Sequence, residues 1–290
     1  MSNQPEKSVE ESSSKLQSGL KKLSQWEGEM NQLEINLDIH RIKTTQPLYS
    51  KRREILKEID KFWYIVLAEN DDFTDYISPD DLKYLEYIDD LYINYPIAND
   101  SIKSRDISKT GGISNVKDFD LTIGFNENPY IAKQSITKKF YFVIGDDGNP
   151  SIRSESVSIQ WPKELEKFNP QLIKEESKGK NMTSEQKKNY RIGMKSFFSF
   201  FSWTGLKPGK EFRNGEDMAW SIAFDLFVNA VKFYVVALSN SNDQDDDDDE
   251  EDSSEGEELD LSDLEPTENN DKRTLQEVEE TKDNKKQKKS

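Results

Sequence analysis

An apolar stripe near the N-terminus constrains the fold more than any other feature of this sequence. Residues 15–44 contain no Pro and only two Gly, and their apolar residues recur at steps of three and four, the period of an α-helix. Such a helix is about 45 Å long, and a narrow stripe over about four heptads is typical of a coiled-coil seam. We therefore predict a dimerisation helix over residues 15–46. The predicted seam consists of Leu16, Leu20, Leu23, Trp26, Met30, Leu33 and Leu37.

The alternative is a helix that lies along its own domain. The rest of the folded chain is expected over residues 47–240, which is fewer than 200 residues. A helix of about 45 Å would overhang a domain of that size. This difference in length favours self-association through the stripe.

The acidic charge is concentrated in one C-terminal segment. The 290 residues include 40 Lys or Arg and 57 Asp or Glu, a net charge of −17. Residues 243–271 alone hold 17 Asp or Glu and no Lys or Arg, whereas residues 1–242 hold 33 basic and 36 acidic residues. Because such a run repels itself and buries little, we predict a disordered acidic tail over residues 241–290. The Ser- and Glu-rich residues 1–14 are also predicted to be disordered.

The tail has two interpretations. It is either a solubilising segment or a flexible polyanion for basic proteins. Phosphate and carboxylate repel, so nucleic acid is disfavoured as a direct partner of the tail.

The hydrophobic pattern of residues 47–240 predicts an α+β domain. Pro47 is expected to end or kink the first helix, because Pro lacks an N–H and disfavours helical geometry in the residue before it. Alternation with a period of two then predicts strands joined by short links, and hence an antiparallel sheet with one wet face. The expected helices cover 48–67, a segment beginning at Ser78 that carries Leu82, Leu85, Ile88 and Leu91 inward, 184–202 and 217–238, and the expected strands cover 119–125, 136–144 and 156–161.

The chemistry-bearing residues give no sign of an enzyme. The chain has no Cys and one His, His40, so disulfides and thiolate chemistry are excluded. Residues 205–210 resemble a phosphate loop only superficially, because three residues separate the glycines and Glu211 follows the Lys. The run from Asp245 lacks the Gly of a calcium loop. We expect no cofactor, no metal and no membrane span; a charge pair at Asp225 and Lys232 makes the apolar stretch over 217–238 a core helix.

A basic cluster ends the chain. Lys285, Lys286, Lys288 and Lys289 form the kind of segment that nuclear import receptors bind, although a chance Lys-rich terminus has the same composition. We expect an import receptor as a partner and the nucleus as the location, with shuttling through the cytoplasm.

The sequence resembles the nucleosome assembly protein family of histone chaperones. Residues 46–52, with the sequence QPLYSKR, and Phe62-Trp63 are similar to the family's junction between dimerisation helix and domain. Residues 125–130, FNENPY, are similar to a strand-to-strand turn of the family, and residues 197–201, FFSFF, to its aromatic segment. Residues 201–212, FSWTGLKPGKEF, most resemble the family's fungal vacuolar-protein-sorting branch. The likeness extends from about residue 16 to residue 238.

This resemblance implies a homodimer that binds core histones on an acidic face, with the tetramer-forming pair as the expected cargo. It also implies a fungal histone acetyltransferase as a partner. One departure is visible: where the family shows two adjacent acids, this chain has only Asp225, so the tail is expected to carry more of the binding. The expected histone-binding residues are Glu216, Asp217, Asp225, Asp245, Asp246, Asp247, Asp248, Asp249, Glu250, Glu251 and Asp252.

Two other functions fit the same features. The protein could serve mainly to stabilise and activate the acetyltransferase, a role compatible with histone binding. A coiled-coil trafficking adaptor is the alternative from a different class, as the name of the fungal branch would suggest.

Overall fold

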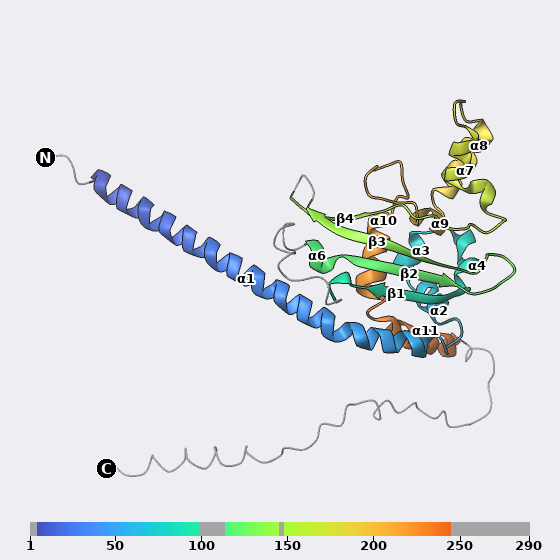
Figure 1. The fold of residues 1–290 in the computed structure, drawn as a ribbon, viewed down its shortest axis with the longest axis horizontal. Coiled ribbons are helices and arrows are strands. Elements are labelled where there is room, and N and C mark those ends of the chain that lie inside the picture. Colours follow the sequence, from blue (N-terminus) through green and yellow to red (C-terminus); the bar gives the residue numbers. More distant parts are fainter. Residues whose placement is uncertain (1–4, 99–113, 145–147, 245–290) are drawn as a thin grey trace, which may run out of the picture. The chain divides into compact units, whose positions relative to one another are not determined.

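A long N-terminal helix dominates the computed structural model (Figure 1), which describes residues 5–98, 114–144 and 148–244. Helix α1 spans Pro5–Leu56, a length of 52 residues. It confirms the predicted long helix and corrects both of its boundaries. The helix begins at Pro5, inside the segment 1–14 that was predicted to be disordered, and it continues ten residues beyond residue 46.

Pro47 lies inside α1 because the residues around it hold the helix on the sheet. The side-chain amide of Gln46 donates to the Tyr92 hydroxyl at 2.6 Å and to the Ile93 carbonyl at 3.1 Å. Its carbonyl oxygen accepts the backbone N–H of Tyr95 at 3.2 Å. These buried bonds and the packing around them outweigh the loss of one backbone donor. The helix expected over 48–67 is therefore two elements, the end of α1 and the short helix α2, Phe62–Ala68.

This junction gives a stability test. We expect Gln46→Leu to lower the free energy of unfolding by about 2–3 kcal/mol, because it leaves the buried Tyr95 N–H and Ile93 carbonyl without their partner. Gln32→Leu, at an exposed position on the same helix, serves as the matched control and should change stability by less than about 0.5 kcal/mol. Urea unfolding measures both. Equal stability of the two variants would contradict the anchoring role of Gln46.

The domain contains one antiparallel sheet with the strand order β1-β2-β3-β4. Strand β2 confirms the prediction over 119–125, and its inward residues Phe119, Leu121 and Ile123 are buried. Two expectations were wrong: β1 occupies residues assigned to a helix, and the last strand lies before the predicted 156–161 segment. Ile88 and Leu91 do point into the core, but from a strand. The strands span Ile88–Asn94 (β1), Phe119–Phe125 (β2), Gln134–Ile144 (β3) and Pro150–Ser154 (β4).

Short helices cover one side of the sheet. The helix expected over 184–202 is interrupted after Gly193, and the one expected over 217–238 is bent by 87° between 215–226 and 230–240. At this bend the guanidinium of Arg52 donates to the carbonyls of Phe227, at 2.5 Å, and Val228, at 3.3 Å. The remaining helices are α3 Asp71–Asp75, α4 Leu82–Leu85, α6 Ser114–Lys117, α7 Pro170–Glu176, α8 Ser184–Gly193, α9 Phe197–Phe200, α10 Gly215–Trp220, a π-helix Ser221–Leu226 and α11 Ala230–Gln244, with 3-10 turns at Pro79–Asp81, Pro96–Ala98 and Glu166–Phe168.

Among the described residues, no single helix is long and apolar enough to cross a membrane. Only the bent pair made by residues 215–226 and 230–240 reaches the required length and composition. The first of its two arms is largely buried, as expected for a core helix, but the second exposes Val231, Val235, Val236 and Leu238, so the expectation of a core helix over 217–238 was wrong for that arm.

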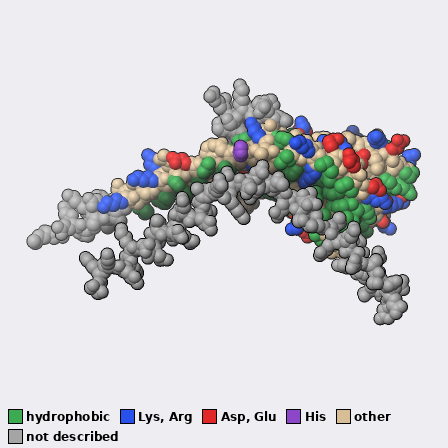
Figure 2. All heavy atoms as spheres, turned by 90° about the horizontal axis from the view of Figure 1, so that it is seen from below, with side chains coloured by type: hydrophobic (Ala, Val, Ile, Leu, Met, Phe, Trp, Pro, Cys, Tyr) green, Lys and Arg blue, Asp and Glu red, His purple; other side chains and the backbone are tan. Residues whose placement is uncertain are grey.

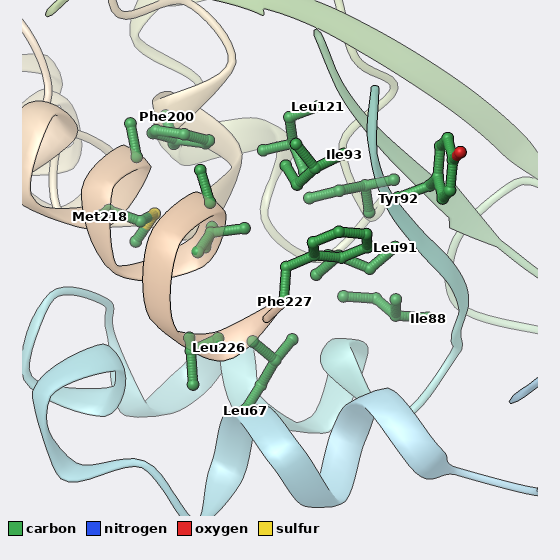
Figure 3. Close-up of a cluster of buried hydrophobic side chains, with 14 of the residues drawn as sticks. Leu67, Ile88, Leu91, Tyr92, Ile93, Leu121, Phe200, Met218, Leu226 and Phe227 are labelled. Carbon is green, nitrogen blue, oxygen red and sulfur yellow. The ribbon is translucent and has the colours of Figure 1, made fainter. Parts of the chain in front are cut away.

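The core lies between the sheet and the helices that follow it. Phe227 is central: its ring stacks with Trp63 and meets Tyr92 edge to face, with centroids 6.5 and 5.9 Å away. Figure 3 shows Leu226, the last residue of the π-helix, and Phe227, in the turn after it, pointing toward side chains of β1 and α2. The aromatic run of residues 197–201 supplies further buried rings, which explains why the interrupted helix there still has a fixed position.

Candidate functional site

The predicted seam residues form an exposed apolar stripe on α1. Trp26 is 58% exposed and Leu37 59%, and all seven seam residues are between 41% and 64% exposed. The stripe is visible as green side chains along the helix in Figure 2. Large apolar side chains in one continuous row on a helix mark a contact surface. The row therefore fits the predicted role in self-association, which a single chain does not test.

A second apolar surface lies at the other end of the same helix. Leu48 and Ile55 on α1 are 58% and 60% exposed, and Val228, Val231 and Val235 lie on or beside α11 with exposures of 40–50%. We call these five residues the α11 patch. Arg52 joins its two parts, because it reaches from α1 to the Val228 carbonyl. The face turned toward the viewer in Figure 2 shows such apolar side chains over this end of the molecule.

The three acids predicted in the domain do not form one cluster. Glu216 accepts the backbone N–H of Ile152 at 2.8 Å and so binds the edge of β4. Asp225 accepts the side-chain amide of Asn229, in the turn between the two arms of the bend, at 2.8 Å. Glu216 is therefore engaged within the domain, whereas Asp225 remains exposed.

Asp217 has different neighbours. It is exposed, and its charge acts on the hydroxyl of Tyr76 together with the charges of Asp72 and Asp75. Burial first, and then these three carboxylates, raise the pKa of Tyr76 above its usual value. The structure thus groups Asp217 with acids of α3 that the sequence did not single out. A helix-start pattern was the only signal near them.

The remaining predicted sites lie outside the described residues. These are the tail acids 245–252 and the basic cluster 285–289. His40 lies on an exposed part of α1. Within the described ranges, no group of three or more His, Asp or Glu side chains could hold a metal ion.

One functional-looking side chain was missed entirely. Lys138 occupies an inward position of β3 and is fully buried. Its ammonium donates to the carbonyls of Glu155 at 2.6 Å, Phe201 at 3.0 Å and Trp203 at 2.7 Å. Only the protonated amine has three N–H groups for these three acceptors. Burial lowers the pKa of Lys138 to about 7, while the charges of Glu211 and Glu155 oppose that shift.

Lys138 ties the segment around Trp203 to the sheet. Ser154 adds a hydroxyl bond to the Trp203 carbonyl at 2.7 Å, and the Thr204 carbonyl accepts the Ser154 N–H at 3.0 Å. The hydroxyl and backbone of Thr204 in turn bond Glu211. The segment that most resembles the fungal branch is therefore held by a buried cation. Strand alternation predicts that position 138 points inward, but Lys side chains are rarely buried, so the residue type indicates a surface position.

The hydrogen bonds of Lys138 predict that substitutions at the neighbouring residues Lys138 and Lys139 differ sharply in their effect on stability. We expect Lys138→Met to lower the free energy of unfolding by about 3 kcal/mol, because the methionine leaves several buried carbonyls unsatisfied. Lys139→Met, one residue along the same strand and exposed, should change it by about 0.5 kcal/mol or less. Thermal and urea unfolding measure both. If the two variants are equally stable, the carbonyls are satisfied in some other way.

The comparisons with known proteins agree with this fold. The family profile described as nucleosome assembly protein matches residues 56–265, well over half of the chain. The chain belongs to the nucleosome assembly protein family. Vacuolar protein sorting-associated protein 75 of Saccharomyces cerevisiae is similar to it, with 32% identity over 227 residues that cover 77% of this chain and 80% of that protein. A Schizosaccharomyces pombe protein named as a nucleosome assembly protein is 27% identical over 226 residues, covering 77% and 82%.

Solved structures of the nucleosome assembly protein family share the architecture. The crystal structure of the Vps75 histone chaperone matches with a TM-score of 0.64 and 30% identity, and the match covers 77% of this chain and 98% of that one. The crystal structure of Ccp1 matches with a TM-score of 0.54 and 25% identity. The α+β fold with a long N-terminal helix and a four-stranded antiparallel sheet is therefore that of the family, and the predicted family and fold class are confirmed.

Proposed function

We propose that this protein is a histone chaperone that binds core histones for nucleosome assembly. The observation that carries the proposal is the match to the Vps75 histone chaperone, which extends over almost all of that structure. Its family relatives are named for nucleosome assembly. No enzymatic role is part of the proposal, because the site residues hold acids, amides and an apolar stripe without a nucleophile beside a base.

The proposed active form is a homodimer joined through α1. The exposed stripe supplies an apolar seam, and the α11 patch supplies a second exposed apolar surface at the far end of the same helix. An antiparallel pair would bring the stripe of one helix toward the patch of its partner. Such burial removes apolar area from water at about 25 cal/mol per Å².

The seam can be tested by charge insertion. We expect Leu33→Glu with Leu37→Glu to give monomers at micromolar concentration, because a buried unpaired carboxylate costs several kcal/mol. Gln25→Glu with Gln32→Glu adds the same charge on another face of α1 and should leave the dimer intact. Multi-angle light scattering measures the mass. A dimeric mass for the Leu33 and Leu37 variant would exclude the seam.

Histone capture is proposed to combine two surfaces. The acidic tail, including Asp245–Asp252, attracts Lys- and Arg-rich histones by Coulomb forces, which speeds encounter and suppresses misplaced contacts with DNA. The folded domain adds acids such as Asp217, with its α3 neighbours, and shape complementarity. The domain carries the selectivity, because polyanions alone discriminate poorly between basic partners.

The division between tail and domain predicts a salt effect. Removing residues 243–290 should weaken histone binding and flatten its salt dependence, because the Debye length falls from about 10 Å at 0.1 M to about 3 Å at 1 M salt. The truncated protein should keep some binding through apolar contact, which salt does not screen in this way. Titration at several salt concentrations measures both slopes. Identical slopes would make the tail a passive solubiliser, and no histone binding by either protein would refute the chaperone role.

The remaining partners are further parts of the proposal. A fungal histone acetyltransferase is proposed to receive the bound histone, and an import receptor is proposed to bind Lys285, Lys286, Lys288 and Lys289 and direct the protein to the nucleus. An acetyltransferase subunit and a trafficking adaptor are the alternatives. Separate titrations with core histones and with the acetyltransferase distinguish them: an adaptor binds neither, and a dedicated subunit binds only the enzyme.

A further inference from the structure

A strongly basic segment interrupts an otherwise acidic domain. Residues 177–214 contain nine Lys or Arg and only two Glu, although residues 1–242 as a whole carry an excess of acids. This segment includes α8, which projects beside α7 at one end of the domain in Figure 1. Histones are basic, so the cations of this segment repel them and are suited to a different class of partner.

The basic segment lines a cleft with a volume of about 600 Å³. Lys188, Arg191 and Lys195 form one wall, and Arg213 approaches from the loop before α10. All four side chains are exposed. Asp75 is the one carboxylate in the lining, and the nearby acids Asp72 and Asp217 lie outside it. The cations therefore exceed the carboxylates of the cleft by three.

The cleft also has an aliphatic lining between its charges. Pro79, which is exposed, comes from the opposite wall, where Ile77 is buried, and the half-buried Ile192 comes from α8 between the basic residues. A phosphate group gains no free energy from contact with an aliphatic surface, whereas leucine or isoleucine side chains of a peptide would bury apolar area on it. Flat nucleic-acid bases stack on exposed aromatic faces, and this lining offers at most one, because Phe212 is almost fully buried and Tyr76 is half-buried.

The two walls are held together at their base. Asp81, which follows one wall, accepts the Ser196 hydroxyl at 2.9 Å and the Phe197 N–H at 2.8 Å, just beyond Lys195 on the other wall. Gly193 fixes the end of α8 in addition, because a Cβ there would come within 1.7 Å of the Phe168 carbonyl oxygen. Because the walls of the cleft are already fixed, ordering them on ligand binding costs little conformational free energy.

We propose that this cleft binds an acidic peptide segment of a partner protein in which aliphatic residues alternate with Asp or Glu. In an extended peptide, alternate side chains point to opposite sides, so one row can meet the cations while the other lies on Pro79 and Ile192. Arg191 and Arg213 can each bind a carboxylate with two N–H groups. The four cations of the cleft are not among the residues assigned to histone binding or self-association, although Asp75 in its lining is one of the α3 acids proposed to contribute to histone binding.

The test uses the full chain and a fluorescently labelled acidic peptide with alternating Leu. We expect Lys188→Glu with Arg191→Glu to weaken binding about tenfold or more, equivalent to about 1.4 kcal/mol. The matched control, Lys180→Glu with Lys187→Glu, makes the same change of charge on exposed residues outside the cleft and should weaken binding by less than about twofold. Circular dichroism and melting verify that both proteins fold.

Three further probes make the result decisive. Replacing the Leu of the peptide by Ser, or mutating Ile192→Asp, should also weaken binding, because the aliphatic contact is lost. Equal weakening by both charge-reversal pairs would show diffuse attraction and overturn the site. Tighter binding of a single-stranded oligonucleotide than of the peptide, lost in the Lys188 and Arg191 variant, would assign the cleft to nucleic acid instead. Core histones titrated in parallel should bind that variant no more weakly than the unaltered chain, and a matching loss of histone binding would show that the peptide and the histones use the same side chains.

Discussion

The fold depends on how α1 is anchored to the sheet by its second half. Gln46 places three hydrogen bonds on β1 and the turn after it, and Arg53 adds an ion pair with Asp90. These contacts fix the direction in which the free half of the helix leaves the domain. Without them the exposed stripe would still be amphipathic, but its orientation relative to the domain would not be defined. These contacts therefore fix the orientation of the seam residues of α1 relative to the domain.

The sequence predicted best what depends on periodicity. The stripe of α1 and the alternation of β2 are regular over many residues, and both were found where the pattern placed them. The prediction that Pro47 ends or kinks the helix was wrong, because the loss of one backbone donor costs less free energy than the tertiary hydrogen bonds of Gln46 contribute. The prediction of a helix at Ile88 and Leu91 was wrong, because their spacing suits a helix but their segment pairs with β2 and forms a strand.

The site residues were harder to predict than the elements. Acids can be counted in a sequence, but whether a carboxylate is free depends on contacts between distant segments. The Glu216 carboxylate accepts a backbone N–H of β4, whereas Asp217, the next residue, remains exposed near α3. Lys138 and Asp81 look like surface charges in the sequence, and only the packed structure shows that each satisfies backbone groups in the interior.

The bond between Glu216 and Ile152 also governs how partners can approach the sheet. On β4 the outward N–H groups of Ile152 and Ser154 already donate, to a side-chain carboxylate and to the Thr204 carbonyl. An incoming strand would have to displace both bonds to extend the sheet at this edge. β-strand addition at this edge is therefore disfavoured. The same protection lowers the tendency of the domain to aggregate edge to edge.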